Sequence, residues 1–168
     1  LKFLAYIYII MCIGSTATAQ TIPTLENAVY GGLIKTQYAS SVNWMEDGEH
    51  FAKIEYNESS KRPEIVTYSA KDQSREVLIP ANMLINKANR KSLSISSWNL
   101  SPDHEKVLIF TNTRRVWRYH TRGDYWVLNR KSGVLYQLGK GLDESSLMFA
   151  KFSPDSRKVA FVSKNNIY

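Results

Sequence analysis

The sequence predicts an all-β fold: the N-terminal part of a β-propeller, incomplete, with about two and a half four-stranded blades. A hairpin signature, consisting of an apolar residue, Ser-Pro-Asp and a β-rich run, occurs at residues 100–109 and again at residues 152–161. These two copies are 52 residues apart, and a weaker copy at residues 44–54 lies 56 residues before the first of them. No helical pattern interrupts the repeat. A strand-and-turn repeat near 50 residues is typical of propeller blades.

The Ser-Pro-Asp step predicts a tight turn on physical grounds. Proline has its φ already set for the second turn position, and the aspartate side chain can accept a hydrogen bond from the turn backbone. The apolar run after each turn has the residue types of a buried strand. Three unrelated turns in a β-sandwich remain the alternative at this point.

Residues 1–19 are predicted to be a signal peptide. A basic start is followed by an apolar segment and by Ala17-Thr18-Ala19, which predicts cleavage after Ala19 and export to the periplasm or the medium. The apolar segment is too short to span a bilayer, so no stable membrane insertion is expected. Cys12 is the only cysteine, and Met11 before it argues against a lipoprotein anchor. Residues 20–168 then form the partial propeller domain.

The remaining elements follow in chain order. Thr24 is expected to cap a short helical turn over residues 25–29. Polar turns and a longer connection at residues 80–93 separate the strands. The predicted strands are 42–44, 51–56, 64–69 and 75–79 in the first blade, 95–98, 106–111, 124–129 and 134–138 in the second, and 147–152, 158–163 and the start of another at 165–168 in the third.

Composition and motifs exclude several functions. The net charge is +7, but the basic residues are scattered along predicted turns, so no nucleic-acid partner is expected. There is no Gly-x-Ser-x-Gly, His-Glu-x-x-His, cysteine pair or phosphate loop. His50, His104 and His120 are expected in turns or loops, and no two have metal-ligand spacing. The sequence therefore predicts no catalytic residue, no metal site and no cofactor within these residues.

One predicted loop, residues 112–123, differs from the rest. It carries four arginines and two large aromatic residues, Trp117 and Tyr119, whereas the equivalent connection in the first blade, residues 57–63, is shorter and has no aromatic residue. Enlarged loops on a regular scaffold often carry function. The alternative interpretation is that both aromatic side chains pack over the blade while the arginines are solvated.

These stretches resemble the N-terminal propeller of dipeptidyl peptidase IV in the prolyl oligopeptidase family. The resemblance covers most of the chain after residue 20, and the loop is its most specific part. The Ser-Pro-Asp hairpins are less specific, because other periplasmic propellers use them. The matching segments are residues 100–103, 107–112, 117–120, 125–128, 152–155, 159–162 and 165–168.

The resemblance implies a role for one residue of the loop. In that family an arginine projects from the propeller and hydrogen-bonds a backbone carbonyl of the bound dipeptide, and the matching residue here is Arg118, preceded by Trp117. The sequence departs from the family pattern at Tyr119 and His120, where His and Ser are usual, so these two residues receive no role. Arg118 is thus the one predicted substrate-binding residue.

The resemblance also implies an activity for the parent protein. This would be an exported serine peptidase that removes X-Pro or X-Ala dipeptides from peptides with a free amino terminus. Its paired glutamates and the triad of its C-terminal α/β-hydrolase domain are expected beyond Tyr168, and a homodimer of the complete protein is left open. The alternative is a non-catalytic periplasmic propeller that binds another protein, similar to the Tol-system propeller.

Overall fold

A computed structural model describes residues 24–30 and 41–168, which belong to two separate units. In the first unit, helix α2 (Leu25–Val29) follows Thr24, whose Oγ1 accepts a hydrogen bond from the backbone N of Asn27 at 3.3 Å. This confirms the predicted capped turn. The predicted signal peptide and Cys12 lie outside the described residues. Among the described helices, none has the length and apolarity to cross a membrane.

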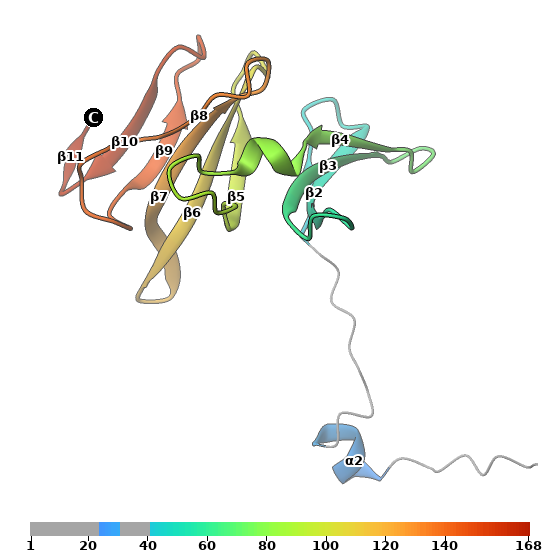
Figure 1. Ribbon diagram of the computed structural model, residues 1–168. Helices are drawn as coiled ribbons and strands as arrows, with labels where there is room; N and C mark the ends of the chain where they lie inside the picture. Colours follow the sequence, from blue (N-terminus) through green and yellow to red (C-terminus); the bar gives the residue numbers. More distant parts are fainter. Residues whose placement is uncertain (1–23, 31–40) are drawn as a thin grey trace, which may run out of the picture. The chain divides into compact units, whose positions relative to one another are not determined.

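The second unit consists of three antiparallel sheets in chain order (Figure 1). The first sheet contains β1 (Asn43–Trp44), β2 (His50–Tyr56), β3 (Pro63–Ser69) and β4 (Arg75–Ile79). The second contains β5 (Ile95–Leu100), β6 (Lys106–Val116), β7 (Tyr119–Asn129) and β8 (Leu135–Gln137). The third contains β9 (Met148–Phe152), β10 (Val159–Ser163) and β11 (Asn166–Ile167). Each sheet is a meander of consecutive strands, which confirms two four-stranded blades and part of a third.

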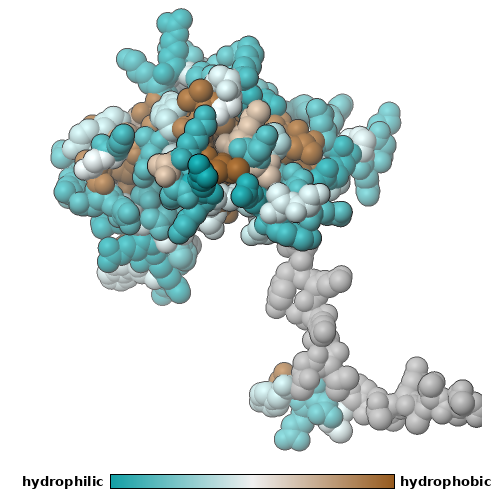
Figure 2. Space-filling model, in the orientation of Figure 1, coloured by the Kyte–Doolittle hydropathy of each residue, from teal (hydrophilic) through white to brown (hydrophobic). Residues whose placement is uncertain are grey.

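The middle sheet buries apolar side chains on both of its faces. Because side chains alternate along a strand, Val107 and Ile109 of β6 face one way and Leu108 faces the other. Val107 and Ile109 pack with residues of the first sheet, whereas Leu108 packs with residues of the third. Most of the face seen in Figure 2 is hydrophilic, and apolar side chains show in a band across it. The β-sandwich alternative is therefore wrong, because a sandwich sheet buries only one face.

The two full copies of the hairpin signature have the same hydrogen bonds. Ser101 Oγ donates to Asp103 Oδ1 at 2.6 Å and accepts from the backbone N of Lys106 at 2.9 Å. In the third sheet, the hydroxyl of Ser153 does the same with Asp155 and Lys158, at 2.6 and 2.9 Å. The repeat seen in the sequence is therefore a repeat of turn chemistry, not of residue type alone.

These turns predict acid sensitivity. The Ser101 hydroxyl lowers the pKa of Asp103, and the Ser153 hydroxyl lowers that of Asp155. Backbone and hydroxyl hydrogen bonds from Ser74 lower the pKa of Asp72 to about 2. A carboxylate whose pKa is lower in the folded state stabilises the fold above its unfolded pKa of about 4, and this contribution is lost as the pH falls through the folded value.

We therefore expect the thermal unfolding midpoint to fall between about pH 4 and about pH 2. The measurement is a series of melts across that interval, with Asp72→Asn as the comparison variant. Asp72→Asn should show a shallower decline, since one of the carboxylates with a lowered pKa no longer titrates. An identical decline in both proteins would contradict the contribution of Asp72.

The structure differs from the sequence prediction in two minor respects. The connection over residues 80–93 contains a short 3-10 helix, η1 (Ala81–Leu84), whose Leu84 is fully buried in the core between the first two sheets. His50 and His120 lie in strands β2 and β7 and not in loops. Both histidines lie where the strand extends beyond its apolar run. Polar residues at the end of a strand show no alternation, so the sequence does not mark them as part of the strand.

Candidate functional site

The predicted loop at residues 112–123 is a β-hairpin. Strands β6 and β7 continue through it and stay paired as far as Val116 and Tyr119, so only Trp117 and Arg118 remain as the turn. Figure 1 shows this hairpin projecting well beyond the rest of its sheet. The prediction of a loop was wrong because arginines occupy both faces of this ribbon. They remove the alternation of polar and apolar residues by which a strand is recognised in a sequence. The turn also lacks the Asn-Gly or Asp-Gly pair that marks most two-residue hairpins.

The tip of the hairpin is exposed. Trp117 and Tyr119 are 94% and 72% exposed, so the alternative in which both aromatic side chains pack over the blade is wrong. Trp117 has a φ of 61°, which is uncommon for a residue other than glycine, and its carbonyl accepts a hydrogen bond from Arg115 Nε at 3.2 Å. Arg118 is exposed beside it, and its guanidinium takes part in none of the ion pairs found among the described residues.

Polar contacts run along the hairpin towards its base. Thr113 Oγ1 and His120 Nδ1 lie 3.0 Å apart across the two strands. Arg114 and Arg122 lie directly opposite each other, an arrangement of like charges that is unfavourable unless anionic groups are near. A cavity of about 260 Å³ beside them contains Asp143, Glu144, Ser145, Ser146, Met148, Lys164 and Asn165 in its lining. Acidic side chains therefore lie near the two arginines at the base, although none of the hairpin's four arginines takes part in an ion pair among the described residues.

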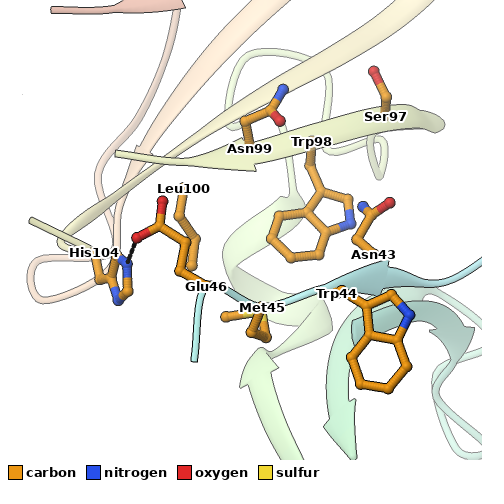
Figure 3. Close-up of a pocket in the computed structure, with 9 residues that line it drawn as sticks. All are labelled: Asn43, Trp44, Met45, Glu46, Ser97, Trp98, Asn99, Leu100 and His104. Carbon is orange, nitrogen blue, oxygen red and sulfur yellow. Dashed lines mark ion pairs between the residues drawn. The ribbon is translucent and has the colours of Figure 1, made fainter. Parts of the chain in front are cut away.

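A second cavity, of about 300 Å³, lies between the first strands of the first two sheets. Figure 3 shows its lining side chains arriving from β1, β5 and the turns that follow them, with the His104 imidazole directed at the Glu46 carboxylate. The Nε2 and Oε2 atoms of this pair are 3.6 Å apart. The indole of Trp98 is 5% exposed, whereas that of Trp44 is 62% exposed. This cavity is not predictable from the sequence, because it depends on the packing of two blades.

The densest cluster of titratable groups lies on one face of the first sheet. Glu55 Oε1 accepts from the Tyr68 hydroxyl at 2.7 Å and lies 2.9 Å from Lys53 Nζ, while Arg75 contacts Glu55 and the buried Glu64 at 3.2 and 2.8 Å. Burial raises the pKa of Glu55, but hydrogen bonds from Lys53, Tyr68 and Arg75 outweigh it and hold the pKa below its usual value. Every charge in this cluster has a partner, and four of its residues, Glu55, Glu64, Tyr68 and Arg75, line a cavity of about 720 Å³.

No group of three potential metal-ligating side chains occurs within residues 24–30 and 41–168. The hairpin tip carries the predicted binding residue Arg118. In the sequence Arg118 stands between two exposed aromatic residues, Trp117 and Tyr119, and a guanidinium together with aromatic side chains suits recognition of a polar group with apolar neighbours.

Comparison with known proteins gives a consistent result. Residues 101–168 match the family model for the dipeptidyl peptidase IV N-terminal region. Dipeptidyl aminopeptidase B of Saccharomyces cerevisiae is 33% identical over 97 residues, which is 58% of this chain and 11% of that protein. A probable dipeptidyl-aminopeptidase B of Neosartorya fischeri is 27% identical over 163 residues, covering 93% of this chain and 18% of the relative.

A solved structure shows the same similarity in three dimensions. The crystal structure of Porphyromonas gingivalis dipeptidyl peptidase 4 superposes with a TM-score of 0.66 and 25% identity, over 88% of this chain and 20% of that one. This chain is thus short beside its relatives, spanning 11% and 18% of the two curated proteins named above.

The succession of antiparallel meander sheets defines this chain as part of a β-propeller. More specifically, it resembles the N-terminal propeller region of dipeptidyl peptidase IV, and the resemblance predicted from the sequence is confirmed.

Proposed function

We propose that this chain is the N-terminal propeller portion of an exported serine-type dipeptidyl aminopeptidase, and that it binds and gates the peptide substrate. The substrate is a peptide with a free amino terminus, cleaved after an X-Pro or X-Ala dipeptide. In this proposal the chain supplies no catalytic residue. The serine chemistry belongs to a C-terminal α/β-hydrolase domain of the complete protein, and Arg118 contributes to substrate binding.

The observation that carries the proposal is the position of Arg118 at the tip of a projecting hairpin. Its guanidinium has no ion-pair partner among the described residues, so its donors are available to a ligand. Trp117 beside it is 94% exposed, and aromatic side chains are enriched in the contact regions of proteins. Both features support a tip that meets another molecule, and the resemblance to dipeptidyl peptidases suggests a peptide.

The chemistry of the guanidinium fits a peptide carbonyl. The group is planar, stays charged at any relevant pH and has five N–H donors in a fixed geometry, so it can bind one or two carbonyl oxygens without being rearranged. A hydrogen bond from a charged donor in a partly desolvated cleft stabilises a complex by about 1.5 to 3 kcal/mol. In this way Arg118 would hold the backbone of the bound dipeptide and leave side-chain selection to other residues.

The activity can be tested on the product of the complete reading frame that encodes this chain. We expect hydrolysis of Gly-Pro and Ala-Pro chromogenic dipeptides and no hydrolysis of the same compounds with an acetylated amino terminus, because the proposal requires a free amine. A product that cleaves neither form would refute the peptidase proposal and leave a propeller that only binds a partner.

The role of Arg118 is tested by Arg118→Ala in that enzyme. Loss of a charged hydrogen bond should lower kcat/KM for dipeptide substrates by roughly ten- to a hundredfold. Arg118→Lys should lie between the variant and the wild type, because the ammonium retains the charge but not the planar donors. Arg122→Ala removes the same charge from the base of the hairpin and should change kcat/KM little. Equal kcat/KM in the wild type and in Arg118→Ala would remove the assigned role.

A further inference from the structure

The orientation of the hairpin is set at its base. Its tip is highly exposed, with Trp117 and Tyr119 at 94% and 72%, so few tertiary contacts restrain the tip itself. A ribbon of this length would swing freely unless something fixed the point where it leaves the sheet. The contacts that could do so lie around Asn112 and Asp124, where the regular pairing of β6 and β7 is interrupted.

A β-bulge occurs at this point. Thr111 pairs with Asp124, and the next pair towards the tip is Arg114 with Arg122, so β6 contains one residue more than β7 between the two pairs. Asn112, within the bulge, has a φ of 48°. Bulges bend a strand and increase its twist, and they occur where a side chain has to be aimed. The bulge therefore bends β6 at the point where the hairpin leaves the sheet, and a second register shift follows between Arg114 and Arg115.

The carboxylate of Asp124 holds this bulge. Asp124 is 8% exposed, and both of its oxygens accept hydrogen bonds at 2.8 Å. Oδ2 accepts from Nδ2 of Asn112, and Oδ1 accepts from the backbone N of Ser145, which lies in the segment before β9. One buried carboxylate thus connects the bulged strand with the connection between two blades.

Two further contacts strengthen the same junction. The Ser145 hydroxyl donates to the carbonyl oxygen of Asn112 at 2.6 Å. Gly123 and Leu147 exchange two backbone hydrogen bonds, each of 3.0 Å, between their N and O atoms. Asn112 is consequently bonded through its side chain to Asp124 of its own sheet and through its carbonyl to Ser145, which lies in the connection before the next sheet. Because Asp124 is buried, its bonds are costly to break, since a buried polar group without a partner loses its solvation as well.

We propose that Asp124 is a positioning residue for substrate binding: by joining Asn112 to Ser145 it fixes the bulge and so holds Arg118 where the substrate carbonyl lies. This inference rests on the proposed role of Arg118. Asp124 does not touch the substrate, and it acts only through the orientation of the hairpin.

The first test is Asp124→Asn in the complete enzyme. The amide has nearly the same shape as the carboxylate, but one of its two polar groups is an NH₂. This NH₂ group must face either the Asn112 amide or the backbone N–H of Ser145, both of which are donors, so one hydrogen bond is lost. Misplacing a binding group by about 1 Å can reduce a rate as much as a hundredfold, and we expect kcat/KM to fall by roughly tenfold. The fall should appear mainly as a higher KM, because Arg118 contacts the bound dipeptide and not the reacting atoms.

A double-mutant cycle separates positioning from general destabilisation. In the Arg118→Ala background, Asp124→Asn should cause little further loss of kcat/KM, because the group that it positions is absent. Asp103→Asn is the matched control: it alters a hydrogen-bonded aspartate at the opposite end of β6 and should show no such coupling. The positioning role would be overturned if the loss of kcat/KM in the double variant equalled the product of the losses in Asp124→Asn and Arg118→Ala.

Hydrogen exchange supplies a readout that does not depend on activity. The backbone amides of residues 113–122 should exchange faster in Asp124→Asn than in the wild type or in Asp103→Asn. The inference would be overturned if these amides exchanged at the same rate in Asp124→Asn as in the wild type. If Arg118→Ala has no effect on catalysis while Asp124→Asn still accelerates this exchange, the proposed role of Arg118 fails and the anchoring of the hairpin by Asp124 stands.

Discussion

Ile109→Ala should lower the free energy of unfolding by about 3 to 4 kcal/mol, the largest effect that we expect from a single substitution in this protein. Ile109 is fully buried, and its neighbours across the strands are Trp98 on β5 and Trp126 on β7. Removing three carbon atoms loses their transfer free energy and leaves a cavity between two indole rings, which cannot collapse without moving both strands. The first two blades share this core, so their packing should weaken together.

The measurement is denaturant unfolding of the wild type and the variant under the same conditions. Ile167→Ala is the matched control, because Ile167 is 79% exposed and the same substitution there should change the free energy of unfolding by about 0.5 kcal/mol or less. Similar losses at both positions would contradict the packing of the first two blades against each other.

Gly123→Ala should lower the free energy of unfolding by about 3 kcal/mol, at the upper end of the range for overpacking. A Cβ atom at Gly123 would lie 2.4 Å from Cε2 of Phe110 and 2.8 Å from the carbonyl oxygen of Thr111. The ring of Phe110 can move only by giving up its stacking on Tyr125, where the ring centroids are 4.6 Å apart. The oxygen of Thr111 belongs to the backbone of the sheet and cannot yield cheaply.

Gly48→Ala distinguishes this clash from the ordinary cost of replacing glycine. A Cβ at Gly48 would meet nothing within 4 Å, but its φ of +68° is a left-handed conformation that costs about 1 kcal/mol for alanine. Thermal and denaturant unfolding of the two variants provide the comparison. If Gly123→Ala lowered the free energy of unfolding no more than Gly48→Ala does, the close approach of Phe110 and Thr111 to Gly123 would be contradicted.

Most of the strands could be predicted from the sequence, because each is bounded by a turn with recognisable residues. Strand β4 has the predicted bounds, and the bounds of β2 and β3 differ from prediction by one residue each. The hairpin at residues 112–123 was missed as a strand pair, although the segment was singled out and Arg118 within it was predicted to bind substrate. Charged residues on both faces of a solvent-exposed ribbon leave no alternation of polar and apolar positions to detect.

The anchor of the hairpin could not have been predicted. In the sequence Asp124 is simply the polar first residue of a predicted strand, and Ser145 lies in a polar connection. Nothing local distinguishes them from other solvated residues. Their roles arise because the third blade packs against the second and brings Ser145 to a carboxylate 21 residues away.

The all-β class, the repeat and the turns follow from the local sequence, because the bonds that form those turns join residues close together in the chain. Ser101 and Ser153 contact groups no more than five residues away, so the local sequence is sufficient. The place where Arg118 is presented is set by tertiary packing. That depends on Ser145 reaching the carbonyl of Asn112, 33 residues away, and such a contact exists only after the blades have packed.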